Sequence, residues 1–219
     1  MNYQLVNREP LITIVDDDRG SRESLAAVAE AAGYRTECFS TGESFLEDGD
    51  LTQTGCLVVD YQLPGLSGVD ILERLNLQRT KPPFVLVSAF ADVTVAVKVM
   101  ELGALTLLEK PYSQDAMLDV ITRAVKIDVT CRKEQQKSEE SLALVKKLTS
   151  KEMDVLQYML RGMSNGSVAG ILKIGLRTVE RRRHEIFKKM KVDSEVEVAE
   201  LVKCSGLELM SSPERHPPV

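Results

Sequence analysis

The sequence predicts two domains: an α/β domain with a doubly wound, five-stranded parallel sheet, and then an all-α domain of four helices. Short apolar runs alternate with helical patterns over residues 10–126, which is typical of a parallel sheet covered by helices on both faces. Residues 148–207 show only helical patterns. The charge also differs: residues 1–126 carry 19 acidic and 11 basic side chains, a net charge of −8, whereas residues 148–219 carry 10 acidic and 12 basic ones, a net charge of +2.

The elements of the first domain follow in a regular order. Gly33 and Gly103 each end a helical pattern, because glycine readily takes the left-handed conformation found after a helix. A strand and helix unit around residues 35–46 completes the five expected units. The other strands are expected at residues 11–15, 56–59, 84–87 and 105–108, and the other helices at residues 21–32, 69–78, 93–102 and 113–126.

A helical linker is expected between the domains, because residues 131–141 are polar and contain neither Gly nor Pro. Whether this linker is rigid or hinged stays open. The last residues contain three prolines and are expected to form a flexible tail. The expected boundaries are 10–126 for the first domain, 127–147 for the linker, 148–207 for the second domain and 208–219 for the tail.

The second domain contains several helix-capping signals. Thr149-x-x-Glu152 is a capping box that opens a helix ended by Gly162, and Ser194-x-x-Glu197 opens the last helix. Between them, helical patterns at residues 165–173 and 177–190 are separated by a turn at Ile174-Gly175.

The composition argues against a membrane-spanning or secreted protein. No apolar run approaches the roughly 20 residues that span a bilayer, and the N-terminus lacks the basic and apolar segments of a secretion signal. The four cysteines are scattered and form no close pair for zinc or redox chemistry, which fits a reducing cytosol. We therefore expect a cytoplasmic protein with no membrane partner.

The total net charge of −5 argues, taken alone, against binding to nucleic acid, because phosphates are neutralised by Lys and Arg. This total conceals a strongly basic segment. Residues 173–191 contain eight basic and two acidic side chains, a net charge of +6. The distribution of charge therefore favours a DNA-binding surface that the total hides.

Polar side chains follow successive strands of the first domain. In a doubly wound sheet, the carboxyl ends of the strands border the functional crevice. Each polar residue alone is compatible with a helix cap or a surface charge, but their repeated occurrence at strand ends indicates a site. Several carboxylates in a small volume need a cation, and an all-oxygen site favours Mg²⁺. The polar residues at these strand ends are Asp16, Asp17, Asp18, Asp60, Ser88 and Lys110.

Five stretches at these positions resemble the receiver domain of two-component response regulators, which has a CheY/flavodoxin-like fold. The resemblance covers residues 10–126. The matching stretches are Ile14-Val15-Asp16-Asp17-Asp18, Val58-Val59-Asp60, Leu63-Pro64-Gly65-Leu66-Ser67-Gly68, Val87-Ser88-Ala89 and Glu109-Lys110-Pro111.

The resemblance implies that Asp60 accepts a phosphoryl group and that Ser88 and Lys110 contact the phosphoryl oxygens. Members of this family usually carry an aromatic residue three positions before the lysine, whereas this chain carries Leu107. The switch formed by Ser88 and Leu107 is therefore expected to work with little help from a rotating ring. The implied Mg²⁺ ligands are Asp16, Asp17, Asp60 and the backbone carbonyl of Gln62.

A short helix, a turn and a basic helix form a helix-turn-helix pattern, whose second helix enters the major groove of DNA. From the residues alone, a basic helix that docks on the acidic first domain is an equal alternative. The surrounding sequence resembles the LuxR/NarL-type four-helix DNA-binding domain. The matching stretches are Leu148-Thr149-Ser150-Lys151-Glu152, Val155-Leu156, Arg161-Gly162, Ser164-Asn165, Arg177-Thr178-Val179-Glu180 and Lys189-Met190.

This second resemblance implies how the basic helix contacts DNA. Side chains that face base edges read sequence, whereas phosphate contacts position the helix. Glu180, Arg181 and His184 are expected at base edges, and Arg177, Thr178, Arg182 and Lys188 at phosphates. Gly166 and Gly170 fall inside the preceding helix and each cost about 1 kcal/mol relative to alanine. The last helix is expected to contribute to a dimer or to the domain core, through Val196, Ala199, Leu201 and Val202.

Together the two resemblances point to a response regulator of the FixJ/NarL family, a phosphorylation-dependent, DNA-binding transcriptional regulator and not an enzyme. The implied partners are a cognate sensor histidine kinase, duplex DNA and, in the active state, a second copy of the chain. The alternatives are a small Asp/Mg²⁺ phosphotransferase and an adaptor whose helical domain binds protein or RNA. The sequence contains no Walker-type loop that would support the former.

Overall fold

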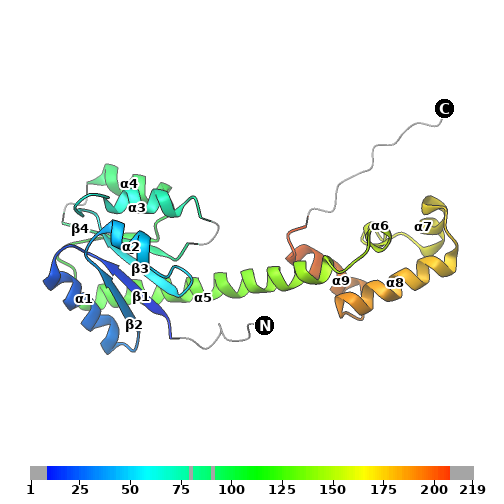
Figure 1. Cartoon of the computed structure of the whole chain (residues 1–219), viewed down its shortest axis with the longest axis horizontal. Helices are drawn as coiled ribbons and strands as arrows, with labels where there is room; N and C mark the ends of the chain where they lie inside the picture. Colours follow the sequence, from blue (N-terminus) through cyan, green and yellow to red (C-terminus); the bar gives the residue numbers. More distant parts are fainter. Residues whose placement is uncertain (1–8, 79–80, 90–91, 208–219) are drawn as a thin grey trace. The chain divides into compact units, whose positions relative to one another are not determined.

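The computed structural model describes residues 9–78, 81–89 and 92–207 of the chain. The chain divides into two compact units, Met1–Arg132 and Lys133–Val219. Strands and helices alternate along the first unit, and the second unit is built from helices (Figure 1). The fold class predicted from the sequence is therefore confirmed.

The sheet of the first unit has five parallel strands in the order β2-β1-β3-β4-β5. The chain moves outward from β1 in both directions, so helices cover both faces, which is the doubly wound arrangement. Every residue of β1, β3 and β4 is buried, which explains why these strands contain the mostly apolar runs at residues 11–15, 56–59 and 84–87. The strands are β1 (Leu11–Val15), β2 (Arg35–Phe39), β3 (Thr54–Asp60), β4 (Phe84–Ser88) and β5 (Thr106–Glu109).

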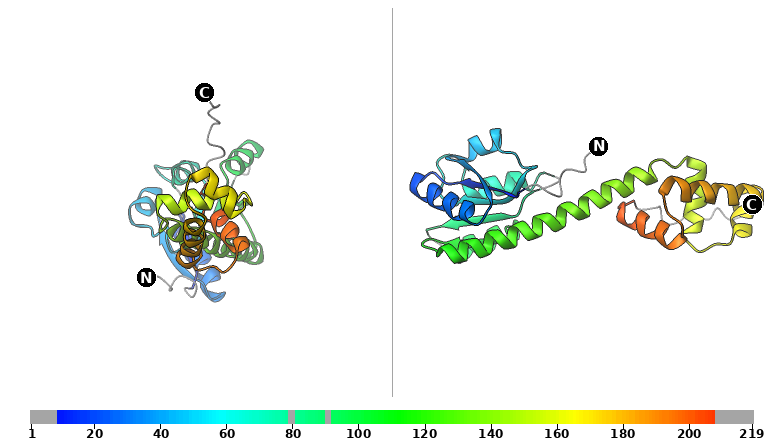
Figure 2. Two further views of the ribbon diagram at one scale, coloured as in Figure 1. Left: turned by 90° about the vertical axis from the view of Figure 1, so that its right-hand side faces the viewer. Right: turned by 90° about the horizontal axis from the view of Figure 1, so that it is seen from below.

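Helices lie on both faces of the sheet (Figure 2). An apolar layer on each face holds them to the strands. On one face, Leu25 of α1 and Ile121 of α5 pack against strand residues such as Val58. On the other face, α2, α3 and α4 contribute Phe45, Leu72 and Val99. The helices are α1 (Arg19–Ala31), α2 (Gly42–Asp48), α3 (Gly68–Leu75), α4 (Val93–Glu101) and α5 (Gln114–Val145).

Side-chain caps and glycines set the ends of these helices. Asp18 caps α1 by accepting a hydrogen bond from the backbone N–H of Ser21. Gly33 and Gly103 follow α1 and α4 with φ angles of +88° and +81°, which glycine adopts without the steric cost of a Cβ. The two predicted helix ends are thus confirmed.

Helix α5 continues far beyond residue 126, and residues 127–145 of the expected linker are helical. Its continuation is tied to the first unit by Arg132. The guanidinium of Arg132 donates to the carbonyl oxygens of Thr52 at 2.6 Å and Thr54 at 2.8 Å, and its Nε donates to the buried carboxylate of Asp128 at 2.6 Å. These contacts explain why the first unit extends through Arg132.

The described part of the second unit contains four complete helices and the end of α5, whose Val145 belongs to the core of this unit. Val155, Ile186 and Val202 from three different helices are buried in one cluster. The predicted capping box is confirmed: the Thr149 hydroxyl accepts from the Glu152 N–H, and the Glu152 carboxylate accepts from the Thr149 N–H. The helices are α6 (Ser150–Met159), α7 (Asn165–Leu172), α8 (Leu176–Met190) and α9 (Glu195–Cys204).

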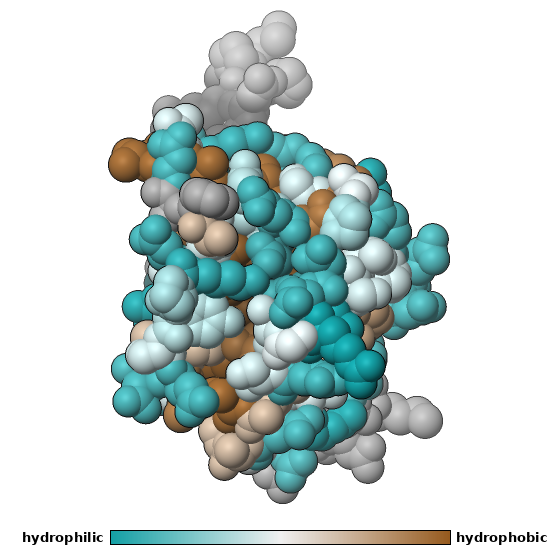
Figure 3. All heavy atoms as spheres, turned by 90° about the vertical axis from the view of Figure 1, so that its left-hand side faces the viewer, coloured by the Kyte–Doolittle hydropathy of each residue, from teal (hydrophilic) through white to brown (hydrophobic). Residues whose placement is uncertain are grey.

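The surface of the first unit mixes hydrophilic and apolar residues. Figure 3 shows a face on which hydrophilic residues cover most of the surface, with apolar residues exposed between them. Among the described residues, no helix combines the length and the apolar character that crossing a membrane requires. Even α5, which has 32 residues, is largely polar over its second half.

Candidate functional site

The topology brings four strand ends together at one edge of the sheet. Asp16 directly follows β1, and Asp60 and Ser88 are the last residues of β3 and β4. Lys110 directly follows β5, and its backbone N–H donates to the Ser88 carbonyl at 2.7 Å. Because these strands are parallel neighbours in the order β1-β3-β4-β5, their carboxyl ends form one continuous edge.

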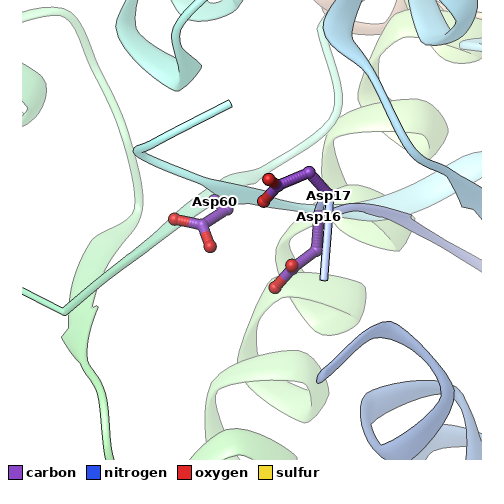
Figure 4. A group of neighbouring side chains, drawn as sticks. All are labelled: Asp16, Asp17 and Asp60. Atoms are coloured by element: carbon purple, nitrogen blue, oxygen red, sulfur yellow. The ribbon is translucent and has the colours of Figure 1, made fainter. Parts of the chain in front are cut away.

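Three carboxylates lie close together at this edge. Asp16, Asp17 and Asp60 each present an oxygen within 4.8 Å of the others. Figure 4 shows the three side chains at the ends of neighbouring strands. Asp16 and Asp60 are buried, whereas Asp17 is exposed, so the cluster is open to solvent on one side. Asp18, the third member of the acidic run, instead caps α1.

Lys110 provides the positive charge inside this cluster. Its ammonium donates to Asp60 Oδ2 at 2.5 Å and to Asp16 Oδ2 at 2.9 Å. Burial opposes the charge of the ammonium, but these two hydrogen bonds prevail and raise the pKa of Lys110. Burial raises the pKa of Asp16. The Lys110 ammonium, which Asp16 shares with Asp60, lowers this pKa but offsets the effect of burial only in part. The negative charge of the three carboxylates therefore exceeds the positive charge of the Lys110 ammonium, which favours the binding of a further cation.

The other predicted residues of the site lie on or just after β3, β4 and β5. The Gln62 N–H donates to Asp60 Oδ1 at 3.0 Å, which turns the chain sharply after β3. Ser88 is completely buried beside β5, where it pairs with Glu109. Leu107 pairs with Leu86 and packs into the apolar layer shared with α2, α3 and α4. No aromatic ring occupies that position.

The second candidate surface is the outward face of α8. Val179, Ile186 and Met190 are buried and attach the helix to the domain core. Four predicted DNA-contact residues recur at spacings of three or four residues on the opposite side, so they form one exposed stripe. These residues are Arg177, Arg181, His184 and Lys188.

The remaining predicted contact residues lie beside this stripe. Glu180 is exposed, and Thr178 is half-buried near the start of the helix. Arg182 is half-buried, and its guanidinium donates to the Lys151 carbonyl at 3.4 Å, which places it on the flank next to α6. Gly166 and Gly170 lie in α7, as expected from the sequence.

Two basic residues of α8 form ion pairs within the DNA-binding domain, and the sequence alone did not reveal these pairs. Lys189 donates to both carboxylate oxygens of Glu152, at 2.8 and 2.6 Å, and Arg183 pairs with Glu195 of α9. A helical period places residues 179, 183, 186 and 190 on one face, so Arg183 could have been assigned to the inner face. The net charge of the segment therefore overstates the charge available for DNA.

Comparison with known proteins identifies the family of each domain. Residues 12–122 match the family described as response regulator receiver domain, and residues 146–202 match the family described as bacterial regulatory proteins, luxR family. The chain therefore belongs to the response regulators that join a receiver domain to a LuxR-type DNA-binding domain.

Individual relatives match along nearly the whole chain. The response regulator protein TmoT of Ectopseudomonas mendocina is 34% identical over 91% of this chain and 89% of its own length. The transcriptional regulatory protein FixJ of Bradyrhizobium diazoefficiens is 31% identical over 90% of this chain and 96% of its own. The solved structure of response regulator StyR is 34% identical, with a TM-score of 0.82 over 90% of this chain and 99% of its own.

These findings define the class of function. The chain is a phosphorylation-dependent transcriptional regulator and not an enzyme, because a receiver and a DNA-binding domain together account for most of its length. The two alternatives left by the sequence, a phosphotransferase and an adaptor for protein or RNA, are set aside.

Proposed function

We propose that Asp60 is the phosphoryl acceptor of this response regulator and that Asp16, Asp17, Asp60 and the backbone carbonyl of Gln62 hold Mg²⁺. The observation that supports this proposal most directly is the group of three carboxylates within 4.8 Å, with the Lys110 ammonium bonded to two of them.

The donor set fits Mg²⁺ in its chemistry. Every side chain in the group offers a carboxylate oxygen, and Mg²⁺ prefers oxygen ligands in an open site that keeps some of its waters. Three carboxylates around one ammonium also leave excess negative charge, which a divalent cation would neutralise. When bound, Mg²⁺ would supply positive charge to the oxygens of a phosphoryl group.

The chain's own residues carry the transfer. A carboxylate oxygen of Asp60 attacks phosphorus, the bond between phosphorus and the donor's leaving atom breaks, and a mixed anhydride forms on Asp60. Lys110 already donates to Asp60 and would shift its hydrogen bond to a phosphoryl oxygen. Ser88, at the end of the neighbouring strand, would contact another phosphoryl oxygen, and the packing of Leu107 would change with it.

Transfer of radiolabelled phosphate tests the role of Asp60. A sensor histidine kinase or a small phosphodonor such as phosphoramidate is the source. Asp60→Asn preserves the shape of the side chain and removes the nucleophile, so we expect no label on this variant. Asp119→Asn, an exposed aspartate on α5, is the matched control and should label like the wild type. Equal labelling of Asp60→Asn would refute the assignment.

We further propose that the exposed stripe of α8 lies in the major groove of duplex DNA. Arg181, His184 and Glu180 would reach base edges, and Arg177, Thr178, Arg182 and Lys188 would contact phosphates. Val196 of α9 supports a dimer, because it is 69% exposed although it is apolar, whereas Val198 and Val202 belong to the core. A homodimer would present two such helices to two half-sites.

The domain boundaries proposed from these features are residues 10–126 for the receiver, 127–147 for the linker and 148–207 for the DNA-binding domain. The contacts of Arg132 attach the first turns of the linker to the receiver. The four cysteines are free, which supports a location in the reducing cytoplasm, where a kinase donor would act.

A further inference from the structure

An arginine on α1 binds the backbone of the acidic loop. Arg22 lies in the first turn of α1, and its Nη1 atom donates to the carbonyl oxygen of Asp16 at 2.5 Å and to that of Asp17 at 3.3 Å. The side chain is half-buried. One guanidinium nitrogen therefore contacts the main chain of two adjacent residues that carry carboxylates of the candidate metal site.

The short turn between β1 and α1 is fixed by several hydrogen bonds in addition to those of Arg22. The Asp18 N–H donates to Asp16 Oδ1 at 2.9 Å, and Asp18 Oδ1 accepts from the Ser21 N–H at 2.6 Å. The Arg22 N–H donates to the Asp18 carbonyl at 3.0 Å, which closes the first turn of the helix. Arg22 thus belongs to the same turn through its backbone and reaches back over it through its side chain.

We propose that Arg22 is a positioning residue for the metal site. By holding the carbonyl oxygens of Asp16 and Asp17, it fixes the peptide planes from which the two carboxylates project toward Asp60. This inference rests on the proposed function, since it assumes that Asp16 and Asp17 bind Mg²⁺. Mutation of residues that orient metal ligands typically weakens metal affinity by about 10–100-fold.

The charge of Arg22 has the opposite effect on a divalent cation. A guanidinium close to the site repels Mg²⁺, so a role as counter-charge alone predicts tighter Mg²⁺ binding when the arginine is removed. A positioning role predicts weaker binding from the same change, because the loop loses its fixed geometry. The sign of the effect therefore separates the two roles.

The test compares full-length variants by isothermal titration calorimetry with MgCl₂. Arg22→Met removes the donors and the charge but keeps much of the side-chain length, and we expect Mg²⁺ binding to weaken by about tenfold. Arg22→Lys keeps the charge but is one atom shorter, and its affinity should lie between those of Arg22→Met and the wild type. The control is Arg19→Met, whose side chain on the same helix pairs with Glu23 at the surface.

The concentration of Mg²⁺ that gives half-maximal labelling of Asp60 provides a second readout. We expect Arg22→Met to raise this concentration while the rate at saturating Mg²⁺ changes little, a split that a general loss of folded protein would not produce. Unchanged or tighter Mg²⁺ binding by Arg22→Met would overturn the inference. If that variant fails to fold, Arg22→Lys decides: weaker binding at an unchanged melting temperature supports positioning, and wild-type affinity overturns it. If the wild type itself binds no Mg²⁺, the proposed metal site fails instead.

Discussion

The buried carboxylate of Glu152 connects the start of α6 to the recognition helix α8, and its removal has a calculable effect. Glu152 accepts the Thr149 N–H at 2.7 Å and both hydrogen bonds from Lys189. Loss of the hydrogen bond from the Thr149 N–H costs about 0.5–1.5 kcal/mol, and a charge-assisted hydrogen bond such as those from Lys189 contributes about 1.5–3 kcal/mol. The side chain of Lys189 is 29% exposed, which reduces the second contribution.

We therefore expect Glu152→Ala to lower the free energy of unfolding of the DNA-binding domain by about 2–3 kcal/mol. For a domain of this size, that corresponds to a fall in melting temperature of about 10–20 °C. Differential scanning calorimetry of the full chain should show this shift in the transition of the second unit alone. Glu200→Ala, an exposed glutamate on α9, is the control and should shift neither transition.

The pH dependence gives an independent check of the same interaction. Burial opposes the charge of Glu152, but the Lys189 ammonium and the Thr149 N–H prevail and lower its pKa below the ordinary value of 4.5. The stabilisation is therefore present above pH 4.5 and is lost as the pH falls through the lower folded-state pKa. The difference between wild type and Glu152→Ala should shrink at pH 3. A loss below 0.5 kcal/mol at pH 7, roughly the effect of an ordinary surface substitution, or an equal loss at both pH values would refute this reasoning.

Three further outcomes follow from the structure. Arg132→Met leaves the buried carboxylate of Asp128 without its cation, so urea unfolding should show a loss of about 2–4 kcal/mol in the receiver; adding Asp128→Asn should recover part of it, and a purely additive double variant would argue against the pair. Lys188→Met should weaken binding to all duplexes alike and reduce the salt slope by about one, whereas a change confined to one sequence would contradict a phosphate contact. Burial raises the pKa of the Cys56 thiol far above its ordinary value, so a thiol reagent should modify Cys56 only after urea unfolding, and rapid reaction of the native protein would contradict its burial.

The sequence predicted the features that depend on periodicity and on the end of a strand. Asp16 and Asp60 were expected at one edge because parallel strands share a direction, and the structure places them there. The capping box at Thr149 was likewise predictable from the sequence, because it involves residues only three positions apart. Local patterns of this kind need no knowledge of how helices pack.

Local sequence patterns do not predict contacts between elements that lie far apart in the chain. Arg132 meets Thr52 and Thr54 across about 80 positions of sequence, and Lys189 meets Glu152 across 37. These pairs depend on the register of one helix against another element, which composition does not specify. The prediction that Ser194-x-x-Glu197 opens the last helix is confirmed, because the Ser194 hydroxyl caps α9 by accepting from the Glu197 N–H. The Glu197 carboxylate in turn accepts from the Asp193 N–H and the Ser194 hydroxyl, a local detail that the motif alone does not specify.

We propose that phosphorylation of Asp60 controls the binding of DNA by α8. The most direct test measures the affinity of the wild type and of Asp60→Asn for a duplex selected from a random pool, with and without phosphodonor and Mg²⁺. We predict that phosphodonor with Mg²⁺ changes the affinity of the wild type and leaves that of Asp60→Asn unchanged. An equal response of both proteins, or no response of a fully labelled wild type, would contradict control of DNA binding by Asp60.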